Sequence, residues 1–158
     1  MKLFQPKINP IPFTKDGIEK IKKEQEELLS QRPGVLDHLN KARAMGDLKE
    51  NGYYQATRQK LNFIDGRLRR ITFLLKYGVV MASQNSGVVD IGAKVVLHDG
   101  IKAYTYTIVG GEESNPSEGK ISHKSPLGRA ILGKKKGEKV TLTVPKGDVI
   151  YTVKEIIM

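Results

Sequence analysis

The sequence predicts an α+β fold: an antiparallel helical coiled-coil hairpin, followed by a small, mostly antiparallel β-sheet domain with a short helix. Two observations support this prediction. Apolar residues follow helical spacing in the first half, whereas the second half consists of short, β-branched segments bounded by glycines. The pattern changes around SQNSG, residues 83–87, so we expect two domains, 1–82 and 83–158.

The first predicted helix begins after Thr14, which is a suitable N-cap behind the proline-containing lead PKINPIP. Pro33 should bend this helix or loosen it locally, and Gly34 beside it adds to the weakness. Its seam positions recur every three or four residues, as in a coiled coil. They are Ile18, Ile21, Gln25, Leu28, Val35, Leu39 and Ala42.

The second predicted helix follows Gly52 and has a regular heptad seam. The seam residues are Thr57, Leu61, Ile64, Leu68, Ile71 and Leu75. Two such helices joined by a short polar segment bury their stripes by folding back on each other. A first arm of about 28 residues would be roughly 40 Å long at about 1.5 Å per residue. That shape suits a probe better than a compact domain.

The second half predicts strands at 93–100, 103–111, 139–145 and 149–157, where apolar runs or alternation end at Gly, Pro or Asp. Between the second and third strands, SPLGRAILG predicts a short helix. Ser125 would be its N-cap, Pro126 its first residue and Gly133 its end.

Composition narrows the function classes. The net charge of +10 and the pI near 9.7 favour a nucleic acid or an acidic protein as partner, with solubility alone as the alternative. The absence of cysteine excludes disulfides and thiolate metal sites, and His38, His98 and His123 show no ligand spacing. The sequence shows neither a membrane span nor a secretory signal, which favours a cytoplasmic location.

The hairpin turn carries two acids, Asp47 and Glu50, at the far end of a basic rod. One interpretation is a capping box, with Asp47 as the cap of the second helix and Glu50 at its third position. The other is a pair of ligands for a divalent cation, because Mg²⁺ prefers oxygen ligands and often takes only one or two protein carboxylates. The two interpretations are compatible, and two carboxylates alone would bind Mg²⁺ weakly.

The second helix is strongly basic, so its surface suits phosphates, although a solvated charged face is the alternative. Tyr53 and Tyr54 beside the turn could stack on a nucleic-acid base or pack the turn.

At this point two long motifs resemble a known family. The stretch ARAMGDLKENGYYQATRQ, residues 42–59, with FIDGRL after it, resembles the tip of the Gre factors of bacterial transcription, which read close to AR-x-x-GDLxENAEY. The segment ISHKSPLGRAILGKKKGEKVTLTVPKG, residues 121–147, resembles the family's IS-x-x-SPxGRAxLGKxxGD segment. The lead PFTKDG and the Arg32-Pro33 pair fit as well, so the resemblance spans essentially the whole chain. Tyr53 departs from it, because the family motif has an acid there, and the GreA-like or GreB-like subtype stays open.

The resemblance implies a transcription elongation factor that is not itself an enzyme. Its hairpin would enter the secondary channel of bacterial RNA polymerase, and its FKBP-like second half would dock on the polymerase. The factor, as a monomer, would stimulate the polymerase's own cleavage of backtracked nascent RNA near the 3′ end. Asp47 and Glu50 match the family's tip acids, which help to bind a Mg²⁺ shared with the polymerase. The remaining implied roles are RNA binding by Arg58 and Lys60, tip support by Arg43, Asn51 and Tyr54, and docking through Ser125 and Pro126.

Three alternatives remain. Some Gre-like proteins occupy the channel and inhibit transcription, but the retained GDLKEN argues against that. A basic coiled coil that binds nucleic acid directly would show salt-sensitive binding independent of Asp47 and Glu50. A prolyl isomerase is disfavoured, because Tyr104, Tyr106 and Tyr151 are the only aromatic residues that the second half offers for a pocket.

Overall fold

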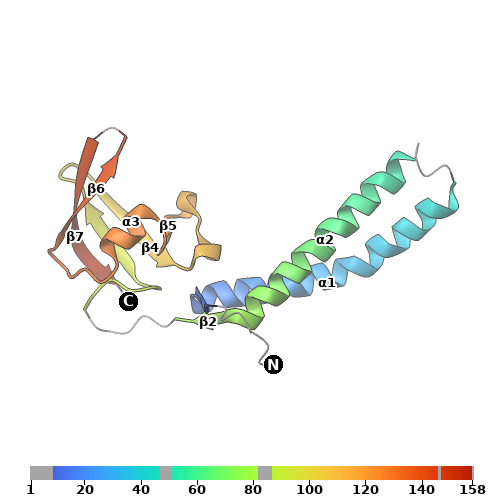
Figure 1. Ribbon diagram of the computed structural model, residues 1–158, viewed down its shortest axis with the longest axis horizontal. Helices are drawn as coiled ribbons and strands as arrows, with labels where there is room; N and C mark the ends of the chain where they lie inside the picture. The colour runs from blue at the N-terminus through green and yellow to red at the C-terminus, as the bar shows by residue number, and fades with distance from the viewer. Residues whose placement is uncertain (1–8, 47–50, 82–86, 146, 158) are drawn as a thin grey trace, which may run out of the picture. The chain divides into compact units, whose positions relative to one another are not determined.

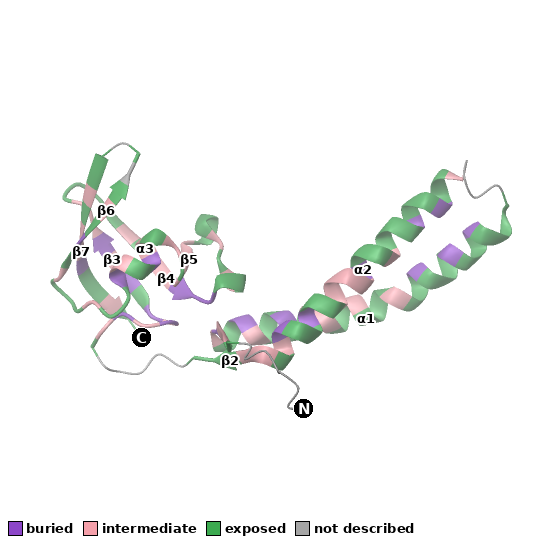
Figure 2. Ribbon diagram, viewed as in Figure 1, coloured by how far each residue is buried: buried purple, intermediate pink, exposed green. Residues whose placement is uncertain are grey.

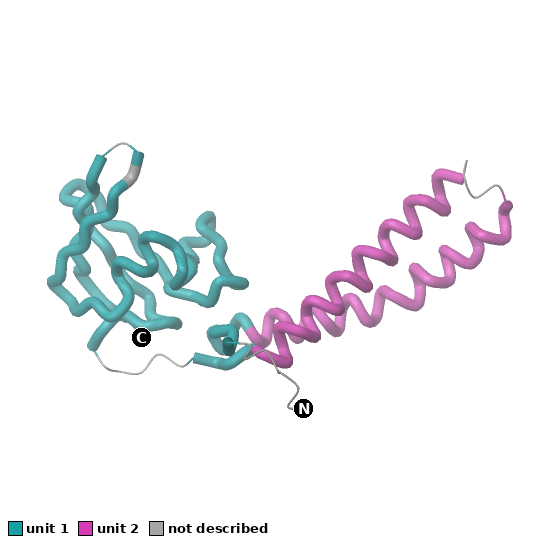
Figure 3. The backbone as a smooth tube through the Cα atoms, viewed as in Figure 1, with its two compact units in different colours: residues 1–17, 78–158 teal, residues 18–77 magenta. Residues whose placement is uncertain are grey.

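The computed structural model describes residues 9–46, 51–81, 87–145 and 147–157, and its chain forms two compact units. Figure 3 shows them in separate colours: residues 18–77 form a helical hairpin, and residues 1–17 with 78–158 form a β unit. The predicted domain boundary between residues 82 and 83 lies outside the described residues, as do Asp47 and Glu50. The predicted α+β class, with a hairpin followed by a mostly antiparallel sheet and a short helix, is confirmed.

The hairpin consists of α1 (Lys15–Ala44) and α2 (Gly52–Tyr77), drawn in Figure 1. α1 continues through Pro33, whose missing N–H leaves the carbonyl of Leu29 without its usual helical donor at an exposed position. Figure 2 shows that the buried positions of each helix form a stripe facing the other helix. The predicted seam is largely confirmed, and its buried members are Ile21, Val35, Leu39, Ala42, Thr57, Ile64 and Ile71.

The seam prediction was wrong near the end of α2. Leu74 is buried at 1% exposure, whereas the predicted seam residue Leu75 is only partly buried. Ile71 and Leu74 are three residues apart and lie on the same side of α2, so the buried stripe ends with a step of three residues where the predicted seam had a step of four. Polar residues beside the seam pair across the hairpin.

Two of these pairs fix the register of the hairpin. The Arg67 guanidinium donates to both oxygens of Glu24, at 2.5 and 2.7 Å, and His38 Nδ1 forms a hydrogen bond with the Tyr53 hydroxyl. Fourteen residues separate Glu24 from His38 on α1, and fourteen separate Tyr53 from Arg67 on α2. The two helices therefore keep one antiparallel register over two heptads.

The β unit contains a five-stranded sheet in the order β5-β4-β3-β7-β6, with β4 and β5 parallel and the other neighbours antiparallel. Its strands are β3 (Lys94–His98), β4 (Ala103–Val109), β5 (Lys120–Ser122), β6 (Lys139–Val144) and β7 (Gly147–Ile157). Four of them match the predicted strands, whereas the three-residue β5 was not predicted. The register of β3 against β7 shifts between Val96 and Leu97, which is a β-bulge.

One face of this sheet carries the core of the unit. The short helix α3 (Pro126–Ile131) contributes Ile131, which is fully buried, and packs Leu127 and Ala130 against the same cluster. The buried cluster is made of Val89, Ile91, Ala93, Val95, Leu97, Ile108, Ile131, Val140 and Val153. Because these side chains alternate with more exposed ones along β3, the strand has the period of two expected for a sheet with one buried face.

A second sheet, of two short strands, was not predicted. β1 (Ile11–Phe13) pairs in parallel with β2 (Gly78–Val80), which directly follows α2. Phe13 is fully buried, and its carbonyl accepts a 2.7 Å hydrogen bond from the Met81 N–H. The chain therefore enters and leaves the helical hairpin through paired strands.

The start of α1 is anchored by a side chain that is distant in sequence. Thr14 is the N-cap, as predicted, because its hydroxyl oxygen accepts a 3.1 Å hydrogen bond from the Gly17 N–H. Glu113, in the short 3-10 helix η1 (Gly111–Glu113), accepts hydrogen bonds from the Thr14 N–H at 2.9 Å and from the Thr14 hydroxyl. A Cβ at Gly110 would lie 2.0 Å from the Pro12 carbonyl oxygen, so this approach requires glycine. A second 3-10 helix, η2 (Pro116–Glu118), follows η1.

Candidate functional site

The two ends of the hairpin frame the segment that carries the predicted acids. α1 ends at Ala44, and Gly46 then adopts a left-handed conformation with φ of 76°. α2 begins at Gly52. Asp47 and Glu50 fall between these ends, outside the described residues, so the structure fixes the flanks of the predicted metal-binding segment.

Asn51 connects the two helix ends. Its side-chain oxygen accepts a 3.0 Å hydrogen bond from the Tyr54 N–H, which makes it the N-cap of α2. Its amide nitrogen donates at 3.2 Å to the carbonyl of Ala42 in the last turn of α1, which also accepts a 3.3 Å hydrogen bond from the Met45 N–H. The proposed cap at Asp47 was therefore the wrong residue for α2 as described. Asn51 was predicted as tip support from the resemblance, and these contacts show how it can act on both helices.

The two tyrosines beside the turn differ in their surroundings. Tyr54 is 8% exposed and packs with Leu39 and Ala42, so it fills the end of the hairpin seam. Tyr53 is 45% exposed, and its ring meets the His38 ring edge-on at a centroid distance of 6.2 Å. The interpretation that the tyrosines pack the turn is confirmed for Tyr54, whereas Tyr53 contacts His38 across the hairpin and keeps 45% of its surface exposed.

The predicted basic residues are exposed and point in different directions. Arg43 lies in the last turn of α1, where a cation complements the partial negative charge of the helix C-terminus. Arg58 and Lys60 are both exposed on α2. Two residues correspond to about 200° of rotation around a helix of 3.6 residues per turn, so these side chains project from opposite sides of α2. The structure does not bring them together into one patch.

Two bidentate ion pairs hold the middle of the hairpin. Hydrogen bonding from Arg67 lowers the pKa of the Glu24 carboxyl, although burial raises it, and Arg32 in the same way lowers the pKa of Asp65. The Arg32 Nε lies 2.7 Å from Asp65 Oδ1. All four side chains are between 31% and 41% exposed, so solvent screens both pairs and neither contributes much to the stability of the fold. Their geometry fixes the register more than it stabilises the fold.

The predicted docking residues form a tight helix start. The Ser125 hydroxyl accepts from the Gly128 N–H at 3.0 Å and donates to the Ser122 carbonyl at 2.8 Å, so Ser125 is the N-cap of α3, as predicted. Pro126 occupies the first helical position and is exposed. A Cβ at Gly128 would lie 2.1 Å from the Ser122 carbonyl oxygen, so the loop and the helix can approach only at a glycine.

Comparisons with known proteins identify the family. The model of the "Transcription elongation factor, N-terminal" family matches residues 11–80, and that of "Transcription elongation factor, GreA/GreB, C-term" matches residues 84–158. The chain belongs to the GreA/GreB family. This confirms the resemblance found in the sequence.

Curated relatives agree with this assignment to the GreA/GreB family. Transcription elongation factor GreA of Nitratiruptor sp. is 40% identical over 92% of this chain and 91% of its own length. Transcription elongation factor GreA of Thermomicrobium roseum is 38% identical over 92% of this chain and 96% of its own length. Among solved structures, GreA factor homolog 1 (Gfh1) of Thermus thermophilus is 24% identical, with a TM-score of 0.45 over 95% of this chain and all of that chain.

The described residues of this GreA/GreB chain contain neither a metal-binding cluster nor a membrane-spanning helix. No cluster of three or more His, Asp or Glu residues there could hold a metal ion. No described helix is long and apolar enough to cross a membrane. His38 was not predicted as a partner of the hairpin tip, although its position two heptads from Glu24 could have indicated that it faces α2.

Proposed function

We propose that this Gre-type elongation factor binds bacterial RNA polymerase and stimulates the polymerase's own hydrolysis of backtracked nascent RNA. The observation that carries the proposal is the end of the hairpin, where Asn51 connects both helices and the segment with Asp47 and Glu50 is enclosed between them. A fixed frame of this kind can present two carboxylates at the end of a narrow, two-helix arm.

The donor set suits Mg²⁺ shared with a partner. Asp47 and Glu50 supply hard oxygen donors, and Mg²⁺ commonly takes one or two carboxylates while water, phosphate or other protein groups fill its remaining positions. In two-metal sites the ions activate water and stabilise the leaving oxygen of a phosphodiester. Two carboxylates alone bind the ion weakly, so the factor has no nuclease activity of its own and acts only on the polymerase.

The other predicted residues support this role from the described surface. Arg43, Arg58 and Lys60 offer positive charge to the phosphates of the extruded RNA 3′ end. Ser125 and Pro126, held rigidly at the start of α3, form a surface through which the β unit docks on the polymerase. The factor acts as a monomer in the cytoplasm, where its polymerase works.

The test uses a defined backtracked elongation complex from a bacterial polymerase in the presence of Mg²⁺. We expect the wild-type protein to release short 3′ RNA fragments only when polymerase is present. Asp47→Asn and Glu50→Gln should each slow cleavage at least about 10- to 100-fold, because each removes a metal ligand. Asp37→Asn is the matched control, since Asp37 is an exposed hairpin acid that pairs with Lys41.

Two results would contradict the proposal. One is cleavage by both tip variants at the wild-type rate. The other is the absence of cleavage by the wild type while it still competes for polymerase, which would indicate an inhibitor that occupies the channel.

A further inference from the structure

The carboxylate of Glu113 closes the start of two helices at once. Within η1, Glu113 is the third residue after the N-cap Gly110, and its Oε2 accepts the Gly110 N–H at 3.2 Å. The same oxygen accepts the Thr14 N–H at 2.9 Å, while Oε1 accepts the Thr14 hydroxyl. Thr14 is the N-cap of α1 and lies 99 residues away in the chain. One side chain therefore serves two N-caps.

The third position of α1 is Gly17, which has no side chain of its own to complete a capping box. In a capping box, Glu or Gln at this position accepts the N–H of the N-cap residue. Gly17 supplies the first half of the box, because its N–H donates to Thr14 Oγ1 at 3.1 Å. The second half, the acceptor for the Thr14 N–H, comes from Glu113. A Cβ at Gly17 would lie 1.9 Å from Glu113 Oε1, so this carboxylate occupies the place of the absent side chain.

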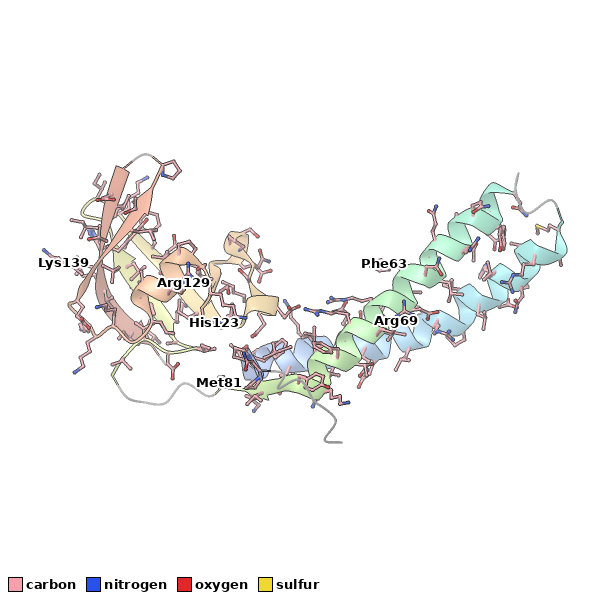
Figure 4. The ribbon with its side chains drawn as sticks, in the orientation of Figure 1. Phe63, Arg69, Met81, His123, Arg129 and Lys139 are labelled. Atoms are coloured by element: carbon pink, nitrogen blue, oxygen red, sulfur yellow. The ribbon has the colours of Figure 1, made fainter. Side chains whose placement is uncertain are left out.

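Both sides of the contact are anchored. Phe13, the last residue of β1, is fully buried, and its carbonyl accepts a 2.7 Å hydrogen bond from the Met81 N–H. On the other side, Val109 ends β4 directly before η1, and its carbonyl accepts a 3.0 Å hydrogen bond from the His123 N–H. Figure 4 labels Met81 and His123. The Glu113 carboxylate thus joins two segments that are each held by the backbone of a neighbouring strand or loop.

Electrostatic attraction adds a second link between the β unit and the start of α1. The pKa of Lys120 in β5 is raised, chiefly by its hydrogen bond to Glu118; burial opposes the shift, and attraction to Glu118, Glu113 and Asp16 adds to it. Asp16 lies in the first turn of α1. The Lys120 ammonium therefore attracts that turn as well as Glu113. Carboxylates beside a helix N-terminus also complement its partial positive charge.

We propose that Glu113 is a positioning residue, which couples the start of the hairpin to the β unit by completing the capping box of α1 from another part of the chain. The first turn of α1 then forms together with η1. Under the proposed function, on which only the cleavage measurement below rests, this link lets a docked β unit hold the arm that carries Asp47 and Glu50. A glutamate at position 17 would cap the same helix without this dependence, and that arrangement supplies the test.

The first measurement is native-state hydrogen exchange at two amides whose backbone acceptors remain in every variant. The Ile18 amide donates to the Thr14 carbonyl in the first helical bond of α1, and the amide of residue 113 donates to the Gly110 carbonyl at 3.2 Å. Glu113→Ala should raise opening at both sites about 10- to 100-fold, because it removes hydrogen bonds to a charged acceptor. Glu113→Gln keeps an acceptor oxygen and should retain most of the protection. Glu155→Ala, which removes an exposed carboxylate of β7, is the matched control.

Two variants at position 17 separate the helix cap from the link. Gly17→Glu combined with Glu113→Ala restores a T-x-x-E capping box within α1, so Ile18 should regain wild-type protection while the amide of residue 113 does not. Gly17→Ala alone favours the helix by propensity, but its Cβ would displace the Glu113 carboxylate. Opening at η1 should therefore rise in this variant.

Cleavage of a backtracked complex then distinguishes positioning from helix stability. Glu113→Ala should lower the maximal cleavage rate about 10- to 100-fold, the order of loss that small misplacements cause. The factor concentration at half-maximal rate should not change, because Ser125 and Pro126 are untouched. The double variant at positions 17 and 113 should remain slow, since its helix start is capped but no longer joined to η1. Glu113→Gln should cleave as the wild type does.

Unchanged exchange at Ile18 in Glu113→Ala would overturn the proposal. Wild-type cleavage by the double variant would also overturn it, since Glu113 would then only stabilise the helix. If the wild type itself releases no RNA fragment, the proposed function fails, whereas hydrogen exchange, which needs no polymerase, still decides whether Glu113 couples the two helix starts.

Discussion

Asn51 offers a quantitative test of how the hairpin end is held. Asn51→Ala removes an N-cap, which costs about 1 kcal/mol, and a hydrogen bond to Ala42, which contributes about 0.5–1.5 kcal/mol. The expected destabilisation of the tip is therefore about 2 kcal/mol. Asn51→Asp keeps the capping oxygen and adds a charge favoured at a helix N-terminus, so it should cost less than about 1 kcal/mol.

The assay is native-state hydrogen exchange at the Gln55 amide, which donates to the Asn51 backbone carbonyl at 3.1 Å and keeps this acceptor in both variants. Because about 1.4 kcal/mol corresponds to a factor of ten, Asn51→Ala should raise local opening about 30-fold and Asn51→Asp less than about fivefold. Amides in α3 of the β unit serve as the internal control. Wild-type exchange at Gln55 in the alanine variant would refute the argument that the Asn51 side chain holds the two helices together.

Three further results are expected from circular dichroism and urea denaturation. Gly128→Ala should destabilise the β unit by at least about 1–3 kcal/mol, because its Cβ would meet the backbone of Ser122; a wild-type midpoint would contradict this. Gly34→Ala, which meets open space within α1, should stabilise the hairpin by about 0.5–1 kcal/mol, and a loss of helicity would refute it. The pKa of Glu24 is lowered by Arg67 in the folded state, so its contribution is present above about pH 4.3 and is lost as the pH falls through the folded pKa. The urea midpoint should fall with it, and Glu24→Gln should reduce this acid dependence.

Local chemical signals in the sequence predicted much of the fold. Thr14 and Ser125 were identified as N-caps because a hydroxyl before a helical pattern has a specific role, and Pro126 reinforced the second assignment. The heptad seams predicted the hairpin because helical packing depends on residue spacing. Strands β3, β4, β6 and β7 followed from alternation and glycine turns in the same way.

Features that depend on distant partners could not be predicted. β1 and β2 are three residues each, and their pairing joins segments separated by both helices. The contact between Glu113 and Thr14 likewise has no local signal. Of the candidate site, the frame around the tip could be predicted from the motif. The difference in burial between Tyr53 and Tyr54 could not be predicted, because it depends on where α2 begins and on which side of α2 faces α1.

Because β1 pairs in parallel with β2, the hairpin starts and ends at one place in the chain's fold, and its length can vary independently of that place. β1 leads into α1, and β2 follows α2. Because these two strands pair, the helices between them can be lengthened without changing where the hairpin begins and ends. Inserting seven residues after Gln31 and seven after Lys60, between the Glu24–Arg67 and His38–Tyr53 contacts, would preserve the heptad phase of both helices but would separate Arg32 from Asp65. Each such paired insertion would extend the arm by about 10 Å. The distance from base to tip is thus an adjustable dimension, set in steps of one heptad.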